Sequence, residues 1–199
     1  RDEFAPGKPL WLTETADAAC GGNPWANTFL DTFRYLDQLG RLARHGVKVV
    51  VHNTLAASDY SLLDEKSGFE PKPNYWAALL WRRLMGPAVL DPAVANQSGL
   101  RAYAHCLRDT PGGVALLAIN TDQTAAHTFT VPAGTRYTLS SAAPNLQTRQ
   151  VQLNGTTLAL ANGDLPALTG EPNAAGSMSL APATITFFAF PDAANSACR

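Results

Sequence analysis

The sequence predicts a chain of two unlike parts, an α/β segment followed by an all-β segment. Residues 1–88 alternate strand, helix, strand and helix patterns with short joins, which is about a quarter of a (β/α)8 TIM barrel, because a complete barrel takes about 250 residues. Residues 89–199 contain short apolar or alternating runs separated by turn residues. That pattern is typical of an antiparallel β-sandwich, so we expect a domain boundary at residue 88.

The first predicted strand, Pro9–Thr15, is a short apolar run bounded by a proline and, further on, by a pair of glycines. It carries the carboxylate of Glu14 at its end. The stretch from Asn27 to Gly46 has apolar residues at helical spacing with charges between them, which predicts an amphipathic helix. Asn27 or Thr28 can cap the start of this helix, and Gly46 can cap its end.

A second strand, Val47–Asn53, follows the helix directly. Because a strand–helix–strand unit with short joins makes two parallel neighbours, Glu14 and the pair His52-Asn53 are expected at the same edge of the sheet. Leu55–Phe69 is predicted to be a loop. Tyr75–Gly86 is predicted to be a second amphipathic helix, with proline at its start and Gly86 at its exit.

The second part is predicted to contain about seven strands and no helix. Asn154-Gly155 between two short runs is a strong hairpin signal, because both residues tolerate positive φ. The predicted strands are Leu100–Leu107, Val114–Asn120, His127–Val131, Tyr137–Ser141, Val151–Leu153, Thr157–Leu160 and Thr184–Phe190.

Composition and charge exclude several classes of protein. Apolar residues make up 46% of the 199-residue chain, and the formal net charge is −1, so no global field recruits nucleic acid or an anionic membrane. No apolar run reaches the ~20 residues that span a bilayer. The first eight residues lack the apolar segment of a signal peptide and resemble the middle of a loop, as if the chain starts inside a larger fold.

The chain has three cysteines, Cys20, Cys106 and Cys198. A cysteine next to a chain terminus is well placed to fix that terminus by a disulfide. We therefore expect a bridge between Cys106 and Cys198 and a secreted or periplasmic protein. Cys20 is then the odd thiol, and no Cys or His lies at the spacing of a zinc site, so no metal is predicted.

Glu14 is the candidate around which a functional site can be built. In a parallel α/β barrel the carboxyl ends of the strands carry the chemistry, because the packed core lies below them and loops surround them. A carboxylate at a strand end can also have a purely structural role: it can charge the start of the next helix, or it can form an ordinary ion pair. The pattern around Glu14 alone does not separate these alternatives.

Several collinear motifs, taken together, resemble the heparanase and β-glucuronidase family of retaining glycoside hydrolases. The resemblance is close over residues 5–88 and looser over the sandwich, where it includes residues 101–106, 151–155 and the final cysteine. No single motif is specific, but their order is. The motifs in the first part are Trp11-Leu12-Thr13-Glu14-Thr15, Gly21-Gly22, residues 33–40, residues 43–47, residues 59–65 and Pro71-Lys72-Pro73-Asn74-Tyr75-Trp76.

This resemblance implies that the chain is the C-terminal part of an enzyme and that Glu14 is its nucleophile. A retaining glycosidase forms a covalent glycosyl ester on one carboxylate and uses a second carboxyl ~5–5.5 Å away as acid and base. In the family that second residue is a Glu beside an Asn on an earlier strand, and none of the five Glu residues here fits it. The resemblance therefore implies a heterodimer in which another chain supplies the front of the barrel.

Members of the family hold the substrate's uronate through backbone N–H groups and a tyrosine. Gly21 and Tyr60 match these positions, and Gly22 can share the role, because a backbone approaches an anion only where no side chain intervenes. Without the resemblance, Gly21-Gly22 is an ordinary turn and Tyr60 a rim aromatic. Ala19-Cys20 stands where the family often has a tyrosine, and His52-Asn53 where the human-type enzyme has Arg-Gln. Asn53 can still bind a sugar hydroxyl, whereas His52 is expected to be structural.

The expected function is cleavage of β-linked glucuronic acid in heparan-sulfate-like or related glycans, without a cofactor. Two alternatives remain. One is a non-catalytic carbohydrate-binding or structural module, in which the sandwich carries the interaction. The other is a retaining glycosidase of the same clan that acts on neutral sugars.

Overall fold

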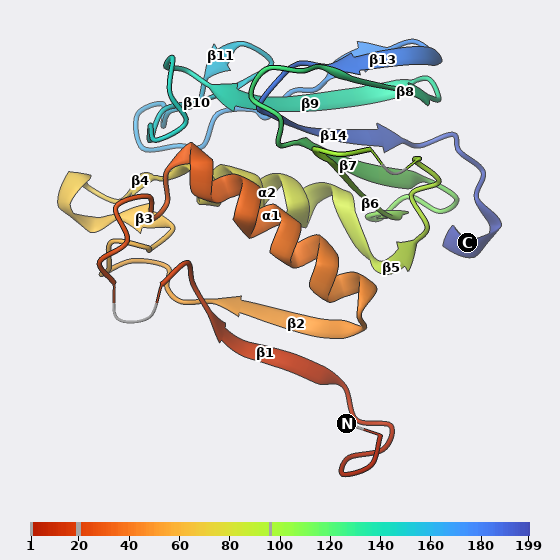
Figure 1. Cartoon of the computed structure of the whole chain (residues 1–199), viewed down its shortest axis with the longest axis horizontal. Helices are drawn as coiled ribbons and strands as arrows, with labels where there is room; N and C mark the ends of the chain where they lie inside the picture. The colour runs from red at the N-terminus through yellow and green to blue at the C-terminus, as the bar shows by residue number, and fades with distance from the viewer. Residues whose placement is uncertain (1, 19–20, 96) are drawn as a thin grey trace.

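The computed structural model describes residues 2–18, 21–95 and 97–199. Most of the regular structure is sheet, with two α-helices and two short 3-10 helices in the described part of the chain. The elements form layers (Figure 1): a large antiparallel sheet has the strand pair β13–β8 on one side and the helices α1 and α2 on the other. The parallel pair β1–β2 lies beyond the helices.

The strand–helix–strand unit of the first part is present. Strand β1 (Leu10–Thr15) and strand β2 (Val47–His52) pair in parallel, with Thr15 opposite His52, and helix α1 (Phe29–Arg44) connects them. The predicted parallel pairing is therefore confirmed. It brings the carboxyl ends of β1 and β2 to the same edge.

Helix α1 is capped differently from the prediction at its start and as predicted at its end. Thr28 occupies the N-cap position, but its hydroxyl donates to the Trp25 carbonyl instead of capping the helix. The first free N–H groups of the helix instead donate to the carbonyls of Thr148 and Leu146, at 2.8 and 2.7 Å. At the other end Gly46 has φ +79°, the left-handed conformation that favours glycine.

The segment between β2 and the second helix is more structured than predicted. Within the expected loop, β3 (Leu63–Asp64) pairs with β4 (Glu70–Pro71), and a 3-10 helix, η1 (Glu65–Ser67), connects them. The second helix, α2, runs from Pro73 to Leu84.

The predicted glycine exit of α2 is wrong, because strand β5 (Met85–Leu90) starts at the residue after the helix and contains Gly86. A Cβ built on Gly86 would lie 2.5 Å from the Cys106 carbonyl oxygen. Glycine is thus needed there for close contact between two backbones. Because β5 already belongs to the large sheet, this sheet begins before residue 88.

The large sheet has eight strands in the order β11-β10-β9-β14-β7-β6-β5, with β12 paired to β9, and every pair is antiparallel. Five of the seven predicted strands have the predicted bounds. Two others differ at their ends, and β5, β12 and β13 were not predicted, partly because β12 and β13 lack an alternating apolar run. The remaining strands are β6 (Leu100–Leu107), β7 (Val114–Asn120), β8 (His127–Val131), β9 (Gly134–Ser141), β10 (Val151–Leu153), β11 (Thr156–Thr157), β12 (Glu171–Asn173), β13 (Gly176–Leu180) and β14 (Thr184–Phe190).

Strand β14 shows how the layers are held together, because all seven of its residues are buried. Ile185 and Phe187 belong to the core between the sheet and the helices, which also contains Trp76 of α2. Phe188, on the other side, belongs to the core under β8 and β13. The N-terminal and C-terminal parts of the chain therefore share a continuous core.

The predicted hairpin and the predicted disulfide are both confirmed. Asn154 and Gly155 have φ of +49° and +81°, as a tight turn between β10 and β11 requires. Cys106 is bonded to Cys198 in the 3-10 helix η2 (Ser196–Cys198), which fixes the C-terminal segment to β6. The odd thiol Cys20 lies outside the described residues.

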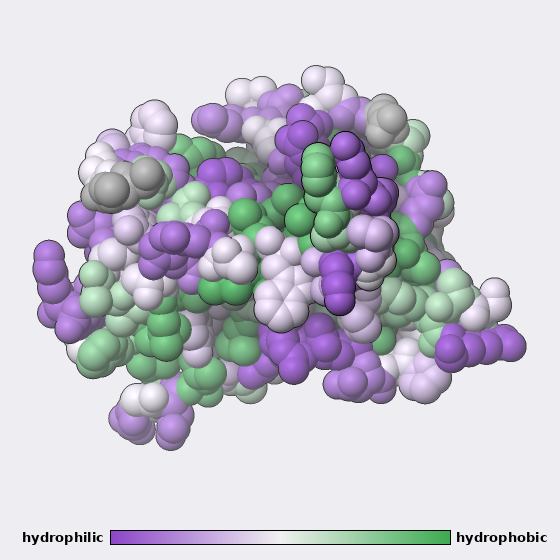
Figure 2. Space-filling view, turned by 90° about the horizontal axis from the view of Figure 1, so that it is seen from below, coloured by the Kyte–Doolittle hydropathy of each residue, from purple (hydrophilic) through white to green (hydrophobic). Residues whose placement is uncertain are grey.

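The β1–β2 pair leaves apolar side chains exposed. Leu10, Trp11 and Val51 are 46%, 57% and 45% exposed, although strands of a closed barrel are buried on both faces. Figure 2, seen from this side, shows hydrophobic residues lying open between polar ones. Among the described helices, none is long and apolar enough to cross a membrane.

Candidate active site

Glu14 and Asn53 meet at the carboxyl ends of the two parallel strands. Because Asn53 directly follows β2, its N–H donates to the Thr15 carbonyl at 2.9 Å and continues the parallel ladder. Its side-chain Nδ2 donates to Glu14 Oε1 at 2.7 Å. Glu14 is exposed, so one amide donor orients the carboxylate while it faces open space. This is an arrangement in which a carboxylate can attack.

Gly21 and Tyr60 lie together in the neighbouring loops. They line a cleft of about 450 Å³, whose charged lining consists of three basic and three acidic residues. A Cβ built on Gly21 would lie 3.8 Å from Tyr60 Cε1, so the aromatic ring stands beside the glycine backbone. Gly21 and Gly22 have φ of +82° and +88°, a conformation that disfavours any residue with a side chain.

The structure thus brings the predicted site residues together as two pairs. Glu14 and Asn53 lie at the ends of β1 and β2, and Gly21 and Tyr60 lie in the loops that follow these strands, but the first pair lies outside the lining of the cleft. Gly22 is exposed and is not part of that lining either.

His52 has the structural position expected of it. Its Nε2 donates to the Tyr60 carbonyl at 2.9 Å, and its ring packs edge-on against Tyr35. Burial lowers the pKa of His52 from its usual 6.5, and the hydrogen bond to the Tyr60 carbonyl opposes that change. A neutral His52 therefore supports the backbone of the loop that carries Tyr60.

Arg149 is a residue of the cleft that the sequence interpretation missed. It comes from the loop between β9 and β10, and its Nη1 lies 2.8 Å from Asp64 Oδ2. The pair joins positions 85 apart in the chain. No local pattern signals such a contact, because it depends on how the large sheet packs beside the helices.

A buried polar cluster lies behind the ends of β1 and β2. Asp31 accepts hydrogen bonds from Arg34 Nε and from Asn74 Nδ2, both at 2.6 Å, and so connects α1 to α2. Burial, together with repulsion from Asp31, raises the pKa of Asp17 above its usual 3.8. No group of three or more His, Cys, Asp or Glu side chains that could hold a metal ion occurs among the described residues.

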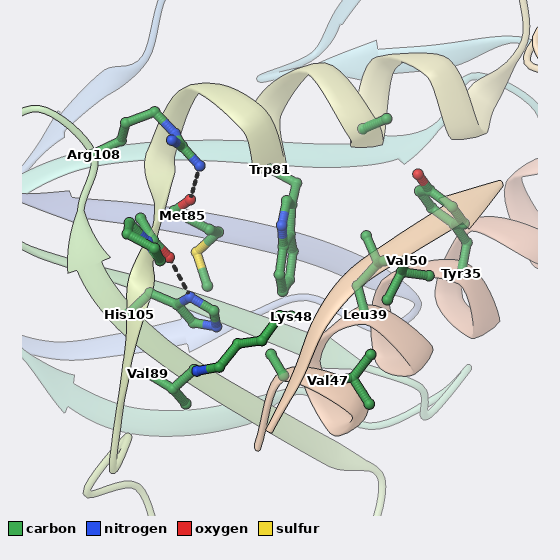
Figure 3. A pocket seen from close by; sticks show the side chains of 14 residues that line it. Tyr35, Leu39, Val47, Lys48, Val50, Trp81, Met85, Val89, His105 and Arg108 are labelled. Atoms are coloured by element: carbon green, nitrogen blue, oxygen red, sulfur yellow. Dashed lines mark hydrogen bonds between the residues drawn. The ribbon is translucent and has the colours of Figure 1, made fainter. Parts of the chain in front are cut away.

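A second cavity, of about 390 Å³, lies at the opposite end of β2 (Figure 3). It is lined by residues such as Val47 and Lys48 at the start of β2, together with Trp81 and His105. His105 Nδ1 donates to the Gly86 carbonyl at 2.7 Å, and the Trp81 ring packs edge-on against it. Because residues at the amino ends of parallel barrel strands normally serve stability, this cavity is a poor candidate for a catalytic site.

Known proteins resemble the chain in sequence and in fold. No protein-family model matches it. It is 38% identical over 213 residues to mouse heparanase, covering 98% of this chain and 39% of that protein. It is 31% identical to human inactive heparanase-2, covering 98% of this chain and 37% of that protein.

In structure, the chain resembles an α-L-arabinofuranosidase from Thermotoga maritima. The TM-score is 0.64 at 14% identity, and the match covers 91% of this chain and 42% of that one. At that identity the likeness concerns the fold alone. The chain spans about two fifths of the length of the curated heparanases it matches, and by its sequence it belongs to the heparanase family.

Proposed function

We propose that this chain is part of a retaining glycoside hydrolase that cleaves β-linked glucuronic acid in heparan-sulfate-like or related glycans. The observation that carries the proposal is the contact between Glu14 and Asn53. An exposed carboxylate, oriented by an amide at 2.7 Å, stands at the carboxyl end of a parallel strand in a heparanase homologue. That is where barrel enzymes place reactive groups.

In this proposal Glu14 is the nucleophile. Its carboxylate attacks the anomeric carbon as the bond to the leaving oxygen breaks, and a carboxylic acid outside this chain donates a proton to that oxygen. Water then attacks the glycosyl ester, gives its proton to the same group and releases Glu14. Asn53, already bonded to Glu14, can also bind a sugar hydroxyl.

The cleft beside Tyr60 is proposed to hold the uronate. Gly21 and Gly22 have no Cβ, so an anion has room to reach their backbone N–H groups. The Tyr60 hydroxyl can donate to the same carboxylate. Because the charged lining is balanced, the specificity comes from these directed donors and not from a general positive field.

The rest of the barrel is proposed to come from a second chain. The exposed Leu10, Trp11 and Val51 are the apolar surface that missing strands would cover. That chain would also supply the acid/base Glu. The barrel segment, which ends with α2, and the sandwich, whose large sheet begins with β5, would then be two parts of one chain of a secreted or periplasmic heterodimer, with the disulfide in keeping with export.

A non-catalytic role is the second candidate. One relative of similar coverage is named inactive heparanase-2, so membership of the family does not decide activity. In that case Tyr60 and Gly21 could still bind a glycan while Glu14 takes no part.

The test is a Glu14→Gln substitution in the complete enzyme, with Glu70→Gln as the control because Glu70 is an exposed carboxylate of β4. We expect Glu14→Gln to remove glycoside cleavage while glycan binding remains, and Glu70→Gln to cleave normally. Near-normal cleavage by Glu14→Gln would refute the nucleophile. Comparing aryl β-glucuronides with matched β-glucosides separates a uronide enzyme from one for neutral sugars.

A further inference from the structure

Lys72 is a buried cation with no evident role in its own helix. It occupies the N-cap position of α2 and is 3% exposed, but its side chain makes no capping bond. A positive charge at a helix N-terminus opposes the helix dipole, and Ser, Thr, Asp or Asn would cap better. Burial, followed by repulsion from Arg149, lowers the pKa of Lys72 from its usual 10.5. Other contacts of the ammonium group must offset the unfavourable helix dipole and the burial of the charge.

The ammonium group is instead bonded to the loop after β2. Nζ donates to the Ser58 carbonyl at 3.2 Å, the Asp59 carbonyl at 3.1 Å and the Ser61 hydroxyl at 3.0 Å. An ammonium has three N–H donors, and each has an acceptor here. All three acceptors lie within the four residues 58–61.

These four residues include Tyr60, which is held from the other side as well. His52 Nε2 donates to the Tyr60 carbonyl at 2.9 Å. Lys72 and His52 thus hold the same short segment from two elements, the start of α2 and the end of β2. The Tyr60 side chain extends from this segment to the Gly21 backbone.

We propose that Lys72 is a positioning residue for substrate recognition: its three hydrogen bonds hold the loop 58–61 so that the Tyr60 ring stays beside Gly21 in the lining of the cleft. Lys72 acts through Tyr60 and does not itself contact the reacting atoms. The ligand it serves is the carboxylate of a uronide, so this role rests on the proposed function. A Lys72→Met change keeps much of the buried volume but removes the donor from the Ser58 and Asp59 carbonyls and from the buried Ser61 hydroxyl.

The experiment uses the complete enzyme and the variants Lys72→Met, Tyr60→Phe and the double variant. Leu80→Ala removes a buried core side chain of α2 and leaves the loop unchanged. It is the control for kinetic changes that come only from a less stable helix α2. KM and kcat are measured with an aryl β-glucuronide and the matched β-glucoside. Hydrogen exchange is measured for residues 53–63.

We expect Lys72→Met to raise KM for the glucuronide about tenfold with little change in kcat, because it weakens substrate binding and not the chemical step. KM for the glucoside should stay unchanged. In the Tyr60→Phe background the Lys72 change should add nothing, since two residues that act through one contact are not additive. Leu80→Ala should not reproduce this selective change.

Hydrogen exchange tests whether Lys72 holds the loop 58–61, separately from the proposed function. Faster exchange confined to the loop in Lys72→Met supports the role of Lys72 in holding the loop. If Tyr60→Phe leaves uronide binding unchanged, that outcome refutes the uronate site and not the role of Lys72 in the loop. Unchanged exchange, a KM increase equal for both substrates, or additive effects of Lys72→Met and Tyr60→Phe would overturn the positioning role.

Discussion

Replacing Gly21 by alanine tests the proposed uronate site through a single methyl group. Gly21 has φ +82°, and an L-residue held in this left-handed region costs about 1 kcal/mol. The new Cβ would lie 3.8 Å from Tyr60 Cε1, an ordinary contact, so the steric term adds little to that strain. The methyl group would, however, occupy the space through which an anion reaches the backbone N–H.

Loss of one hydrogen bond to a charged group costs about 1.5–3 kcal/mol, which corresponds to an increase of about 10- to 100-fold in KM for the uronide. Gly46→Ala is the matched control, because Gly46 has φ +79° and open space around its Cβ position but lies at the end of α1. Steady-state kinetics and denaturant unfolding are measured for both variants. Equal unfolding penalties with a KM increase only in Gly21→Ala are expected. A Gly21→Ala enzyme with normal KM for the uronide would refute the reasoning.

Three further predictions concern Asn53, the disulfide and two buried histidines. Asn53→Ala removes the donor 2.7 Å from Glu14 Oε1 and should lower kcat/KM by about tenfold or more; unchanged kinetics would contradict its role. Cys198→Ser opens a bridge of sequence separation 92 and should lower the free energy of unfolding by about 4–5 kcal/mol in the chain-entropy model, measured by denaturant titration against the wild-type enzyme. Burial lowers the pKa of His52 and His105 from 6.5 in the folded protein. As the pH falls, the two histidines are therefore protonated in the unfolded state before they are protonated in the folded state. Their contribution to the free energy of unfolding should be complete above pH 6.5 and decrease as the pH falls below it. Titrating stability against pH should give a shallower loss for His105→Gln, and an identical pH slope would exclude that contribution.

Much of the fold could be predicted because its signals are local. The apolar spacing of α1, the β-branched run of β2 and the Asn154-Gly155 turn each depend on neighbours in the sequence. Gly86 shows where local reasoning fails. A glycine after an amphipathic helix normally ends it, but this one lies in β5 because the Cys106 backbone approaches too closely for a Cβ. That neighbour is distant in the sequence.

For the candidate site, the sequence predicted that Glu14 and Asn53 lie at the same sheet edge, but it did not predict which residues support the neighbouring loop. Parallel strands placed Glu14 beside Asn53, as expected from their positions at the strand ends. Arg149 and Lys72 reach the cleft through contacts between distant segments. A lysine between two prolines suggests a helix start, and only the folded loop reveals that its ammonium group has three acceptors.

The central claim is that Glu14 forms the covalent bond to the sugar, and trapping that intermediate tests it most directly. The complete enzyme would be incubated with a 2-deoxy-2-fluoro-β-glucuronide carrying a good leaving group, digested, and the labelled peptide sequenced by mass spectrometry. We expect one sugar bound to the Glu14 side chain of strand β1. A label on any other residue, or an enzyme that releases glucuronic acid normally without accumulating a labelled peptide, would contradict it.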